Sequence, residues 1–424
     1  MRLLLITHSY APERTPPQRR WVSFIKEFRA AGWEVDVLVP HADPRAVPGV
    51  SASRRSVPVA PRRGQHGENI RRTWRLPGLS GSRSGRFLGH IVHAIAAVPV
   101  GCLLPRPDAI VITVPALPTV VPGRVLAALR RVPLIVEMRD AWPDLARESG
   151  VTPGPLSRLM ERLVTGAQRS ADLVVTVTEG FAERLAARGV GPVKVVGNGV
   201  ALAEIDPVPA RNRPKGELHV LYLGNHGESQ GLEDVIRAAA LVQDGPERIT
   251  VRLVGDGTQR EALKTFNAEL GGPVTMLDPV HGQDLVDQYA WADTCVVPLR
   301  ADWPSFEWTI PSKTYELLAV GRHITGIVTG EAARVLQESQ AADVVAADPE
   351  QIARLWRDLA RRPESTRVSG RGRRWVAEHA DLPQVGQRLV SMVASLVPAR
   401  GLPSPIIASD PGTLRCTSTE GLTP

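Results

Sequence analysis

Strand-length apolar runs alternate with helix-length amphipathic segments along most of this chain, and this alternation restricts the fold more than any other feature. Residues 2–7 form a short apolar run, and residues 34–39 form the next one. Between them, residues 17–31 place Trp21 and Phe28 on one side of an expected helix. Strands that are separated by helices form βαβ units, so the pattern predicts parallel sheets and the α/β class.

The alternation stops and restarts once, which predicts two domains. Residues 201–216 contain three prolines among polar residues and read as a linker. The expected strands before it are 109–114, 133–138, 172–178 and 193–196, and those after it are 219–223, 250–254, 274–277, 294–298, 323–328 and 343–346. The expected units are a first domain 1–200, the linker 201–216, a second domain 217–382, a final helix 383–398 and a disordered tail 399–424. Two doubly wound, Rossmann-like domains would face each other across a cleft at the carboxyl ends of their strands.

The composition favours anionic partners and a reducing compartment. The 424 residues carry a formal net charge of +7, most of it from arginine. Cys102, Cys295 and Cys416 have no common spacing, which argues against a disulfide framework or a zinc site. The N-terminal apolar run is too short for a signal peptide. We therefore expect a cytoplasmic protein.

Two segments of the first domain suggest contact with a membrane. Residues 50–86 interrupt the alternation with many arginines and one glutamate, and we expect a long, mobile, cationic excursion that is either a solvated loop or a contact with anionic lipid. Residues 87–104 are apolar at helical spacing, which fits a buried helix or a helix lying at the membrane surface. Few aromatic residues are interleaved with the arginines, so we do not expect nucleic acid as a partner.

The segment 311–321 has the features of a phosphate-binding helix. Pro311 begins an apolar helix that Gly321 ends, and Lys313 and Glu316 are three residues apart on its first turn. The N-terminus of a helix beside a lysine attracts a diphosphate, and a carboxylate one turn later suits ribose hydroxyls. An ordinary capped surface helix is the alternative.

Glycine turns follow two strands of the second domain. The first strand ends in the stretch 224–231, which contains four small residues, and the next ends in Gly255-Asp256-Gly257. Glycine lets the backbone approach a ligand closely, and a helix follows each turn. Both turns and the 311–321 helix are expected on one rim of the second sheet.

These segments together resemble the family-4 glycosyltransferases of the GT-B fold. The chain is most similar to the branch that builds bacterial surface polysaccharides, which includes L-fucosamine transferases. The resemblance covers residues 1 to about 397. The matching segments are Tyr10-Ala11-Pro12-Glu13, Glu137-Met138-Arg139-Asp140-Ala141-Trp142-Pro143-Asp144, Gly197-Asn198-Gly199-Val200, Gly224-Asn225, Gln230-Gly231-Leu232, Gly255-Asp256-Gly257 and Pro311-Ser312-Lys313 with Glu316 and Gly321.

The resemblance implies roles for residues of the second domain. Glu316 matches the second glutamate of the family's E-x7-E pattern, which holds the donor ribose, and Lys313 would contact the donor diphosphate. The further residues expected at the donor are Gly224, Asn225, Gln230, Gly231, Asp256, Gly257 and Ser312.

The resemblance also implies roles for the first domain. Asp140 would face the acceptor and the transferred sugar, and we expect it to be catalytic together with Lys313. The first loop would close over the donor, with Glu13, Arg19 and Arg20 as its expected contacts.

The chain departs from the family pattern at several positions. The first glutamate of E-x7-E falls at Trp308, and Glu307 is one place away. The usual Arg and Lys after the first strand of the second domain are replaced by Glu228-Ser229-Gln230, and Arg139 stands where a histidine is frequent.

The expected function is the transfer of a sugar, with retention of its anomeric configuration, from a nucleoside-diphosphate sugar to a lipid-linked or polysaccharide acceptor. We expect the donor to be a UDP-sugar. The chain contains no Asp-x-Asp motif, so we expect neither a metal nor a cofactor, and the enzyme would work at the inner face of the cell membrane. One alternative is an enzyme like the UDP-N-acetylglucosamine 2-epimerases, which share the fold and need no acceptor. Another is a non-catalytic scaffold of a polysaccharide assembly complex.

Overall fold

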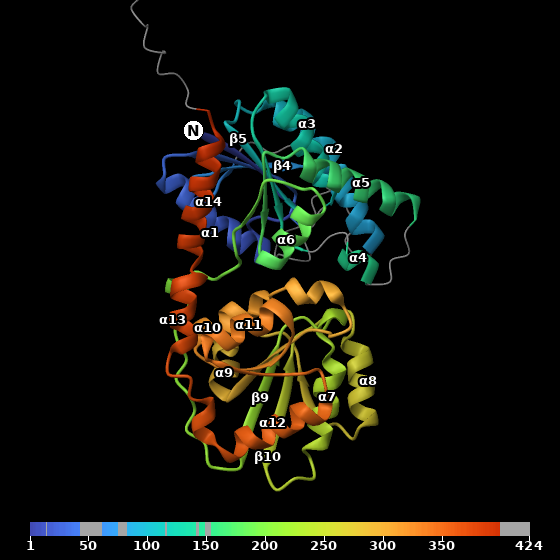
Figure 1. The fold of residues 1–424 in the computed structure, drawn as a ribbon, viewed down its shortest axis with the longest axis vertical. Coiled ribbons are helices and arrows are strands. Elements are labelled where there is room, and N and C mark those ends of the chain that lie inside the picture. The colour runs from blue at the N-terminus through green and yellow to red at the C-terminus, as the bar shows by residue number, and fades with distance from the viewer. Residues whose placement is uncertain are drawn as a thin grey trace, which may run out of the picture.

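The computed structural model describes residues 1–13, 15–42, 62–74, 83–114, 117–140, 144–148 and 154–398. Two β-sheets, each covered by helices on both faces, make two α/β domains that are stacked along the long axis of the molecule (Figure 1). The α/β class and the two Rossmann-like domains expected from the alternating pattern are therefore confirmed. The tail 399–424, which was expected to be disordered, lies outside the described residues.

The first sheet contains eight strands among the described residues, in the order β3-β4-β2-β1-β5-β6-β7-β8. All neighbours are parallel except β3, which runs antiparallel to β4. The strands are β1 (Arg2–Ile6), β2 (Glu34–Pro40), β3 (Arg62–Arg63), β4 (Asn69–Thr73), β5 (Ala109–Val114), β6 (Leu134–Met138), β7 (Leu173–Thr176) and β8 (Val193–Val195).

Two helix layers bury the two faces of this sheet. On β1, Leu3 and Leu5 point into one apolar cluster and Leu4 and Ile6 into the other, as alternation along a strand requires. The first cluster lies under α1 (Pro16–Ala30) and α14 (Leu382–Leu396), and the second lies under α2 (Arg83–Leu103), α3 (Val120–Arg130) and α5 (Pro155–Arg169). The shorter helices α4 (Asp144–Glu148) and α6 (Glu179–Ala187) follow β6 and β7.

The second sheet has six described strands, all parallel, in the order β11-β10-β9-β12-β13-β14. They are β9 (Glu217–Leu223), β10 (Arg248–Val254), β11 (Val274–Leu277), β12 (Thr294–Pro298), β13 (His323–Ile327) and β14 (Ala342–Val345). One face packs on α7 (Leu232–Leu241), α8 (Arg260–Glu269) and α12 (Pro349–Arg361), and the other packs on α9 (Gln283–Trp291), α10 (Ser312–Val320), α11 (Gly330–Ser339) and α13 (Arg371–His379).

The chain crosses between the domains twice, and the two crossings touch. Val200 donates its backbone N–H to the carbonyl of Ala380 at 3.0 Å, and Leu382 donates to Val200 at 3.0 Å. A Cβ on Gly199 would lie 2.0 Å from the carbonyl oxygen of Ala380, so only glycine allows this approach. After the second crossing, α14 returns to the first domain and lies beside α1 (Figure 1).

The excursion expected over 50–86 is partly wrong. Residues 62–74 form β3 and β4 at the edge of the first sheet, where Ile70 joins the core. Tyr10 donates its hydroxyl to the buried carboxylate of Glu68 at 2.7 Å. Pairing with β2, the buried Ile70 and buried hydrogen bonds such as that of Tyr10 thus hold an arginine-rich segment in the sheet. Residues 50–61 and 75–82 lie outside the described residues.

The segment 87–104 is helical, as expected, but it is only half buried. His93 and Ala97 face the interior of the domain, whereas Ile95 is 71% exposed. No helix in the described residues is long and apolar enough to cross a membrane.

Candidate functional site

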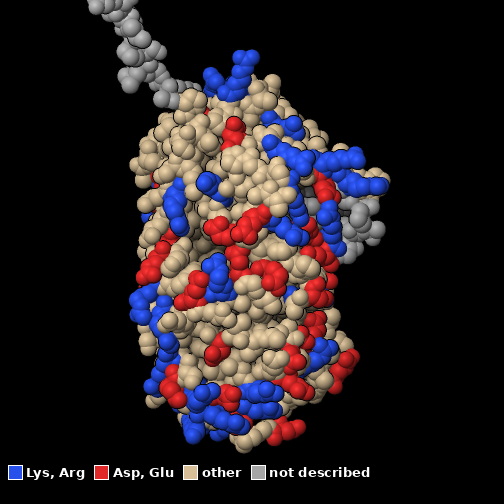
Figure 2. Space-filling view, in the orientation of Figure 1, with Lys and Arg blue, Asp and Glu red and all other residues tan. Residues whose placement is uncertain are grey.

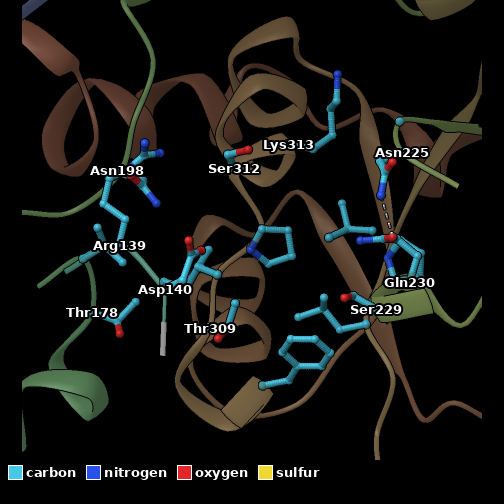
Figure 3. Close-up of a pocket in the computed structure, with 18 of the residues that line it drawn as sticks. Arg139, Asp140, Thr178, Asn198, Asn225, Ser229, Gln230, Thr309, Ser312 and Lys313 are labelled. Atoms are coloured by element: carbon cyan, nitrogen blue, oxygen red, sulfur yellow. Dashed lines mark hydrogen bonds between the residues drawn. The ribbon is translucent and has the colours of Figure 1, made fainter. Parts of the chain in front are cut away.

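A cavity of about 560 Å³ lies between the two domains and is lined by residues of both. The first domain contributes residues that follow β6, β7 and β8, and the second contributes residues that follow β9 and β12 together with the start of α10 (Figure 3). The carboxyl ends of parallel strands in an open α/β sheet are the usual place for a ligand. The cavity therefore lies where the fold class predicts a site.

The N-terminus of α10 forms one wall of the cavity. Pro311 precedes the first turn with its φ at −59°, and Gly321 ends the helix in the left-handed region at φ +81°. Leu317 and Leu318 are buried and fix the helix against the sheet. Ser312 and Lys313 consequently line the cavity with the first turn, where free backbone N–H groups and the helix dipole favour an anion.

Lys313 and Glu316 form a small charged network with Tyr289 of α9. The Lys313 ammonium lies 3.2 Å from Glu316 and 3.3 Å from the Tyr289 hydroxyl, which donates to Glu316 at 2.7 Å. Burial alone would raise the pKa of Glu316, but the charge of Lys313 and these hydrogen bonds outweigh it and lower the pKa. Burial and the Glu316 charge raise the pKa of Tyr289, so the hydroxyl stays a donor.

The network aligns a carboxylate and a cation beside the start of α10. Asp140 lies on the opposite wall of the cavity, and in Figure 3 the Lys313 side chain extends away from it. Glu316 itself does not line the cavity. Its nearest opposite charges include Arg19 of the first domain, which helps to lower the Glu316 pKa.

The turn after β9 forms a second wall. Gly224, Asn225, Ser229 and Gln230 line the cavity. The Gln230 side-chain oxygen accepts from the Asn225 amide at 3.4 Å and from the Gly227 backbone N–H at 3.1 Å, which orients both side chains (Figure 3). These are polar groups without net charge, in keeping with the absence of the usual Arg and Lys here.

Gly231, Asp256 and Gly257 do not line this cavity, and the structure gives them another role. Gly231 joins a single helical turn to α7 at φ +55°, where glycine is favoured. A Cβ on Gly257 would lie 2.4 Å from the carbonyl oxygen of His226, so its turn packs against the β9 turn. Asp256 is exposed and accepts the Gly257 N–H at 2.8 Å. Gly231 and Gly257 thus support the β9 turn from behind.

Arg139 and Asp140 follow β6 and face α10 across the cavity (Figure 3). Burial raises the pKa of Asp140, and the charge of Arg139 offsets part of that shift. The Arg139 Nε is buried without a hydrogen-bond partner among the described residues. A carboxylate with a raised pKa beside an arginine that has an unused donor is typical of a site for a polar, anionic ligand.

The first loop differs from expectation at two of its three residues. Arg20 is buried, its Nε donates to Glu137 at 2.8 Å, and its other nitrogens donate to the backbone of residues 196 and 197. The expected contact of Arg20 with the donor is therefore wrong, because this guanidinium is used inside the first domain. Glu13 is also buried and accepts from Ser9 at 2.6 Å. Arg19 is exposed and remains available.

Several residues of the site are not among those that the sequence assigned to it. They line the cavity or hold its charged pair: Thr178, Asn198, Ser229, Tyr289 and Thr309. Thr178 and Asn198 follow β7 and β8 closely, so a search of every strand's carboxyl end would have found them. Tyr289 lies inside a helix, and only the fold brings it to Glu316.

Both halves of the chain match families of known domains. Residues 17–199 match the family model described as a glycosyl transferase 4-like domain, and residues 217–362 match the model described as glycosyl transferases group 1. A curated relative, the putative colanic acid biosynthesis glycosyl transferase WcaI of Escherichia coli (strain K12), is 26% identical over 359 residues, which cover 78% of this chain and 84% of WcaI. The probable glycosyltransferase WbjE of Pseudomonas aeruginosa is 26% identical over 242 residues, or 52% of this chain and 58% of WbjE.

Solved structures share the fold at low sequence identity. Sucrose-phosphate synthase from Thermosynechococcus elongatus matches with a TM-score of 0.70 at 18% identity, covering 93% of this chain and 98% of that one. Anabaena HepE in complex with UDP-glucose matches with a TM-score of 0.64 at 17% identity, covering 93% and 100%. With one glycosyltransferase domain family on each side of the cavity, the chain belongs to the glycosyltransferases of the GT-B fold.

Proposed function

We propose that this glycosyltransferase moves a sugar from a UDP-sugar to a lipid-linked or polysaccharide acceptor, with retention of the anomeric configuration and without a metal. The observation that carries the proposal is the placement of Lys313 and the α10 N-terminus across one cavity from Asp140. A diphosphate on α10 would direct its sugar toward Asp140. The glycan-synthesis setting is supported by the similarity to WcaI, a putative colanic acid biosynthesis glycosyl transferase. L-fucosamine, which the sequence resemblance suggests, is among the sugars to test first.

The charge that builds on the leaving diphosphate is the main demand of this reaction. As the bond from the anomeric carbon to the diphosphate oxygen breaks, negative charge collects on the phosphate oxygens. The α10 N–H groups, the Lys313 ammonium and the guanidinium of Arg139 are the positive groups at the cavity. They can offset this charge, provided that Lys313 turns from Glu316 toward the phosphate.

Retention needs no covalent bond to Asp140, the carboxylate opposite α10, if the acceptor reacts on the front face of the donor sugar. The acceptor hydroxyl would approach the same face of the sugar from which the diphosphate leaves. Its oxygen bonds to the anomeric carbon, and its proton passes to the departing phosphate oxygen. Asp140, ionised, would stabilise positive charge on the sugar ring and orient a hydroxyl, so positioning and electrostatics would supply most of the catalysis.

UDP as the nucleotide is supported by solved structures of similar fold. Anabaena HepE is described with UDP and with UDP-glucose, and a trehalose-6-phosphate protein of E. coli with UDP-2-fluoro glucose. The first test is thermal stabilisation by a panel of UDP-, GDP- and dTDP-sugars, because a ligand that binds only the native state raises its melting temperature.

Lys313→Ala tests the role of α10. We expect this variant to lose most of the stabilisation by UDP-sugar and to lower kcat/KM for transfer roughly a hundredfold. The matched control is Lys264→Ala. Lys264 lies on α8 and, like Lys313, forms an ion pair with a glutamate three residues away. Unchanged nucleotide binding in Lys313→Ala, with no transfer by the parent protein, would sink the proposal. NMR of the product anomer tests retention, and donor incubated alone should give no epimer.

A further inference from the structure

The outward side of α2 carries a stripe of exposed apolar residues. Leu88, Ile95 and Leu103 are separated by seven and eight residues. Each spacing is about two helical turns, so the three side chains share one face. Ile95 is 71% exposed and Leu103 is 87% exposed. Single exposed aliphatic residues are ordinary on a protein surface, but a full-length stripe marks a contact surface.

The neighbouring helix α3 extends this surface. Val121, Val125 and Leu129 recur every four residues and are all exposed. The two helices lie side by side, because a Cβ on Gly101 of α2 would be 2.4 Å from a methyl carbon of Leu126 on α3. Their buried sides both face the first sheet, so their exposed sides point the same way.

The third helix of this layer, α5, packs on α3 and adds Leu159. Of the twelve large apolar side chains exposed in the described part of the chain, seven lie on these three helices. We call them the apolar face: Leu88, Ile95, Leu103, Val121, Val125, Leu129 and Leu159.

The charge around the apolar face is positive. Neither α2 nor α3 contains an Asp or Glu. Arg124 on α3, Arg131 directly after it, and Arg158 and Arg162 on α5 are exposed, and none of them is in an ion pair with another described residue. The one acidic residue of α5, Glu161, pairs with Arg147. Figure 2 shows Lys and Arg side chains gathered over this side of the first domain. This pattern complements a surface that is apolar inside and negatively charged at its boundary.

The face is built rigidly. Arg130, at the end of α3, donates to the carbonyl of Leu104 at 3.2 Å, and Arg106 donates to the carbonyl of Arg130 at 3.1 Å. These bonds tie the last turns of α2 and α3 together. Little ordering entropy is therefore lost when the face meets a partner.

We propose that the apolar face docks this protein on an anionic lipid bilayer, with its aliphatic side chains at the boundary of head groups and acyl chains and its arginines on lipid phosphates. The inference rests on the proposed function, since it puts a lipid-linked acceptor within reach. The first half of α2 lies near the cavity. The ring centroids of His90 and His8 are 5.8 Å apart, and His8 is close enough to Arg139, which lines the cavity, for that charge to lower its pKa. The face thus begins at the rim of the cleft.

Sedimentation of the full chain with vesicles tests the docking without any nucleotide sugar. We expect binding to vesicles of phosphatidylglycerol and phosphatidylcholine, and much weaker binding to phosphatidylcholine alone. The double variant Ile95→Asp with Leu129→Asp should lower the partition coefficient at least roughly tenfold. Leu241→Asp with Leu270→Asp, which changes two exposed leucines of the second domain, should leave it unchanged.

The arginines give an independent arm. Arg124→Gln and Arg158→Gln should each lower binding about fivefold at low salt, whereas Arg354→Gln on the exposed side of α12 should not. A fluorophore can be attached to the exposed Cys102 at the end of α2 in a Cys416→Ser background, because Cys295 is buried. Its emission should shift to the blue with anionic vesicles only.

Two results would overturn the docking. One is equal sedimentation of the parent protein and the Ile95→Asp, Leu129→Asp variant. The other is a dimer in analytical ultracentrifugation that this variant dissolves, because a second copy would then cover the face. Hydrolysis of donor in solution is measured separately on the same proteins, so loss of the proposed chemistry and loss of membrane docking are distinguishable.

Discussion

Tyr289 is the residue that holds the carboxylate and the cation of the donor side in place. Its hydroxyl is within hydrogen-bonding distance of both Glu316 and Lys313. Tyr289→Phe keeps the ring in the core and removes only this hydroxyl. Because a hydrogen bond to a charged group contributes about 2 kcal/mol, we expect kcat/KM to fall roughly tenfold or more. The variant should also lose about 1–2 kcal/mol of stability, because a buried hydrogen bond is removed.

Tyr10→Phe is the control for that change. Tyr10 is also a buried tyrosine that donates to a carboxylate, Glu68, at the same distance of 2.7 Å, but it lies in the first domain away from the cavity. This variant should lose about 1–2 kcal/mol of stability and keep its kcat/KM. Steady-state kinetics beside urea unfolding separates the two effects, and an equal loss of activity in both variants would contradict the assignment of Tyr289.

The pair Arg139 and Asp140 predicts a pH dependence. Burial raises the pKa of Asp140, so this carboxyl takes up a proton at a higher pH than an ordinary aspartic acid. If the ionised form is the active one, kcat/KM falls as the pH drops through that raised pKa. Arg139 lowers the pKa of Asp140, so Arg139→Met should move the acidic limb of the profile to higher pH.

Asp140→Asn completes this test. It should lower kcat roughly a hundredfold and abolish the acidic limb that Asp140 causes. A profile of log kcat/KM against pH for the three proteins is the measurement. An acidic limb that stays at the same pH in Arg139→Met would show that another group sets it.

Some of the residues that the sequence assigns to the site also line the cavity, and these have a local signal. Ser312, Lys313 and Gly224 are examples. The proline and helix start beside Ser312 and Lys313, and the strand end before Gly224, can be recognised within a few positions of sequence. Arg20 could not be assigned this way, since its partner Glu137 is 117 positions away. The choice between a ligand contact and an internal ion pair depends on long-range packing, which one sequence does not reveal.

At the scale of elements, hydrophobic alternation predicted the sheet strands where the runs were strongly apolar. It missed β4, because Ile70 and Thr73 are its only buried side chains among arginines. It also does not mark the start of α13, which begins at Arg371 after Gly370 at φ +71°. Weak strands and helix starts depend on neighbouring elements and on backbone conformations that apolar spacing does not encode.

The two glycine turns of the second domain act as one element, and Gly257 is the contact between them. A Cβ there would lie 2.4 Å from the oxygen and 2.7 Å from the nitrogen of His226, both backbone atoms that cannot rotate away. Gly257→Ala should therefore cost about 1–3 kcal/mol of stability. It should also weaken UDP-sugar binding by displacing the turn that contains Asn225.

Gly89→Ala is the matched control for Gly257→Ala. A Cβ on Gly89 meets nothing within 4 Å, and the residue lies inside α2. Alanine is favoured over glycine in a helix, so this variant should be as stable as the parent or up to about 1 kcal/mol more stable. Thermal unfolding with and without UDP-sugar compares them, and a harmless Gly257→Ala would refute the packing role of this glycine.

At the scale of the whole molecule, contacts across the cleft define how the domains face each other. Thr178 donates to the carbonyl of Trp308 at 2.7 Å, and the Ser305 backbone N–H donates to Glu148 at 2.9 Å. The guanidinium of Arg184 lies 4.7 Å from the ring centroid of Trp308. Trp308 occupies the place of the first glutamate of E-x7-E, so the chain uses this position for domain contact as well as for lining the cavity.

The final helix completes a domain that begins with the first residues of the chain. Leu389 and Val385 of α14 are buried in the same cluster as Trp21 and Phe24 of α1. Leu389→Ala should destabilise the first domain by about 3 kcal/mol, because it removes buried methyl groups and leaves a cavity. Ser391→Ala, on the exposed side of the same helix, should be neutral.

Calorimetry can show which domain loses stability in Leu389→Ala. If the domains unfold in separate steps, UDP-sugar bound to the second domain raises one transition and identifies it. We expect the other transition to move down, although Leu389 follows the whole second domain in sequence. A downward shift of the ligand-stabilised transition alone would mean that α14 supports the second domain instead, and that the two crossings near Val200 and Ala380 do not separate the folding units as their packing indicates.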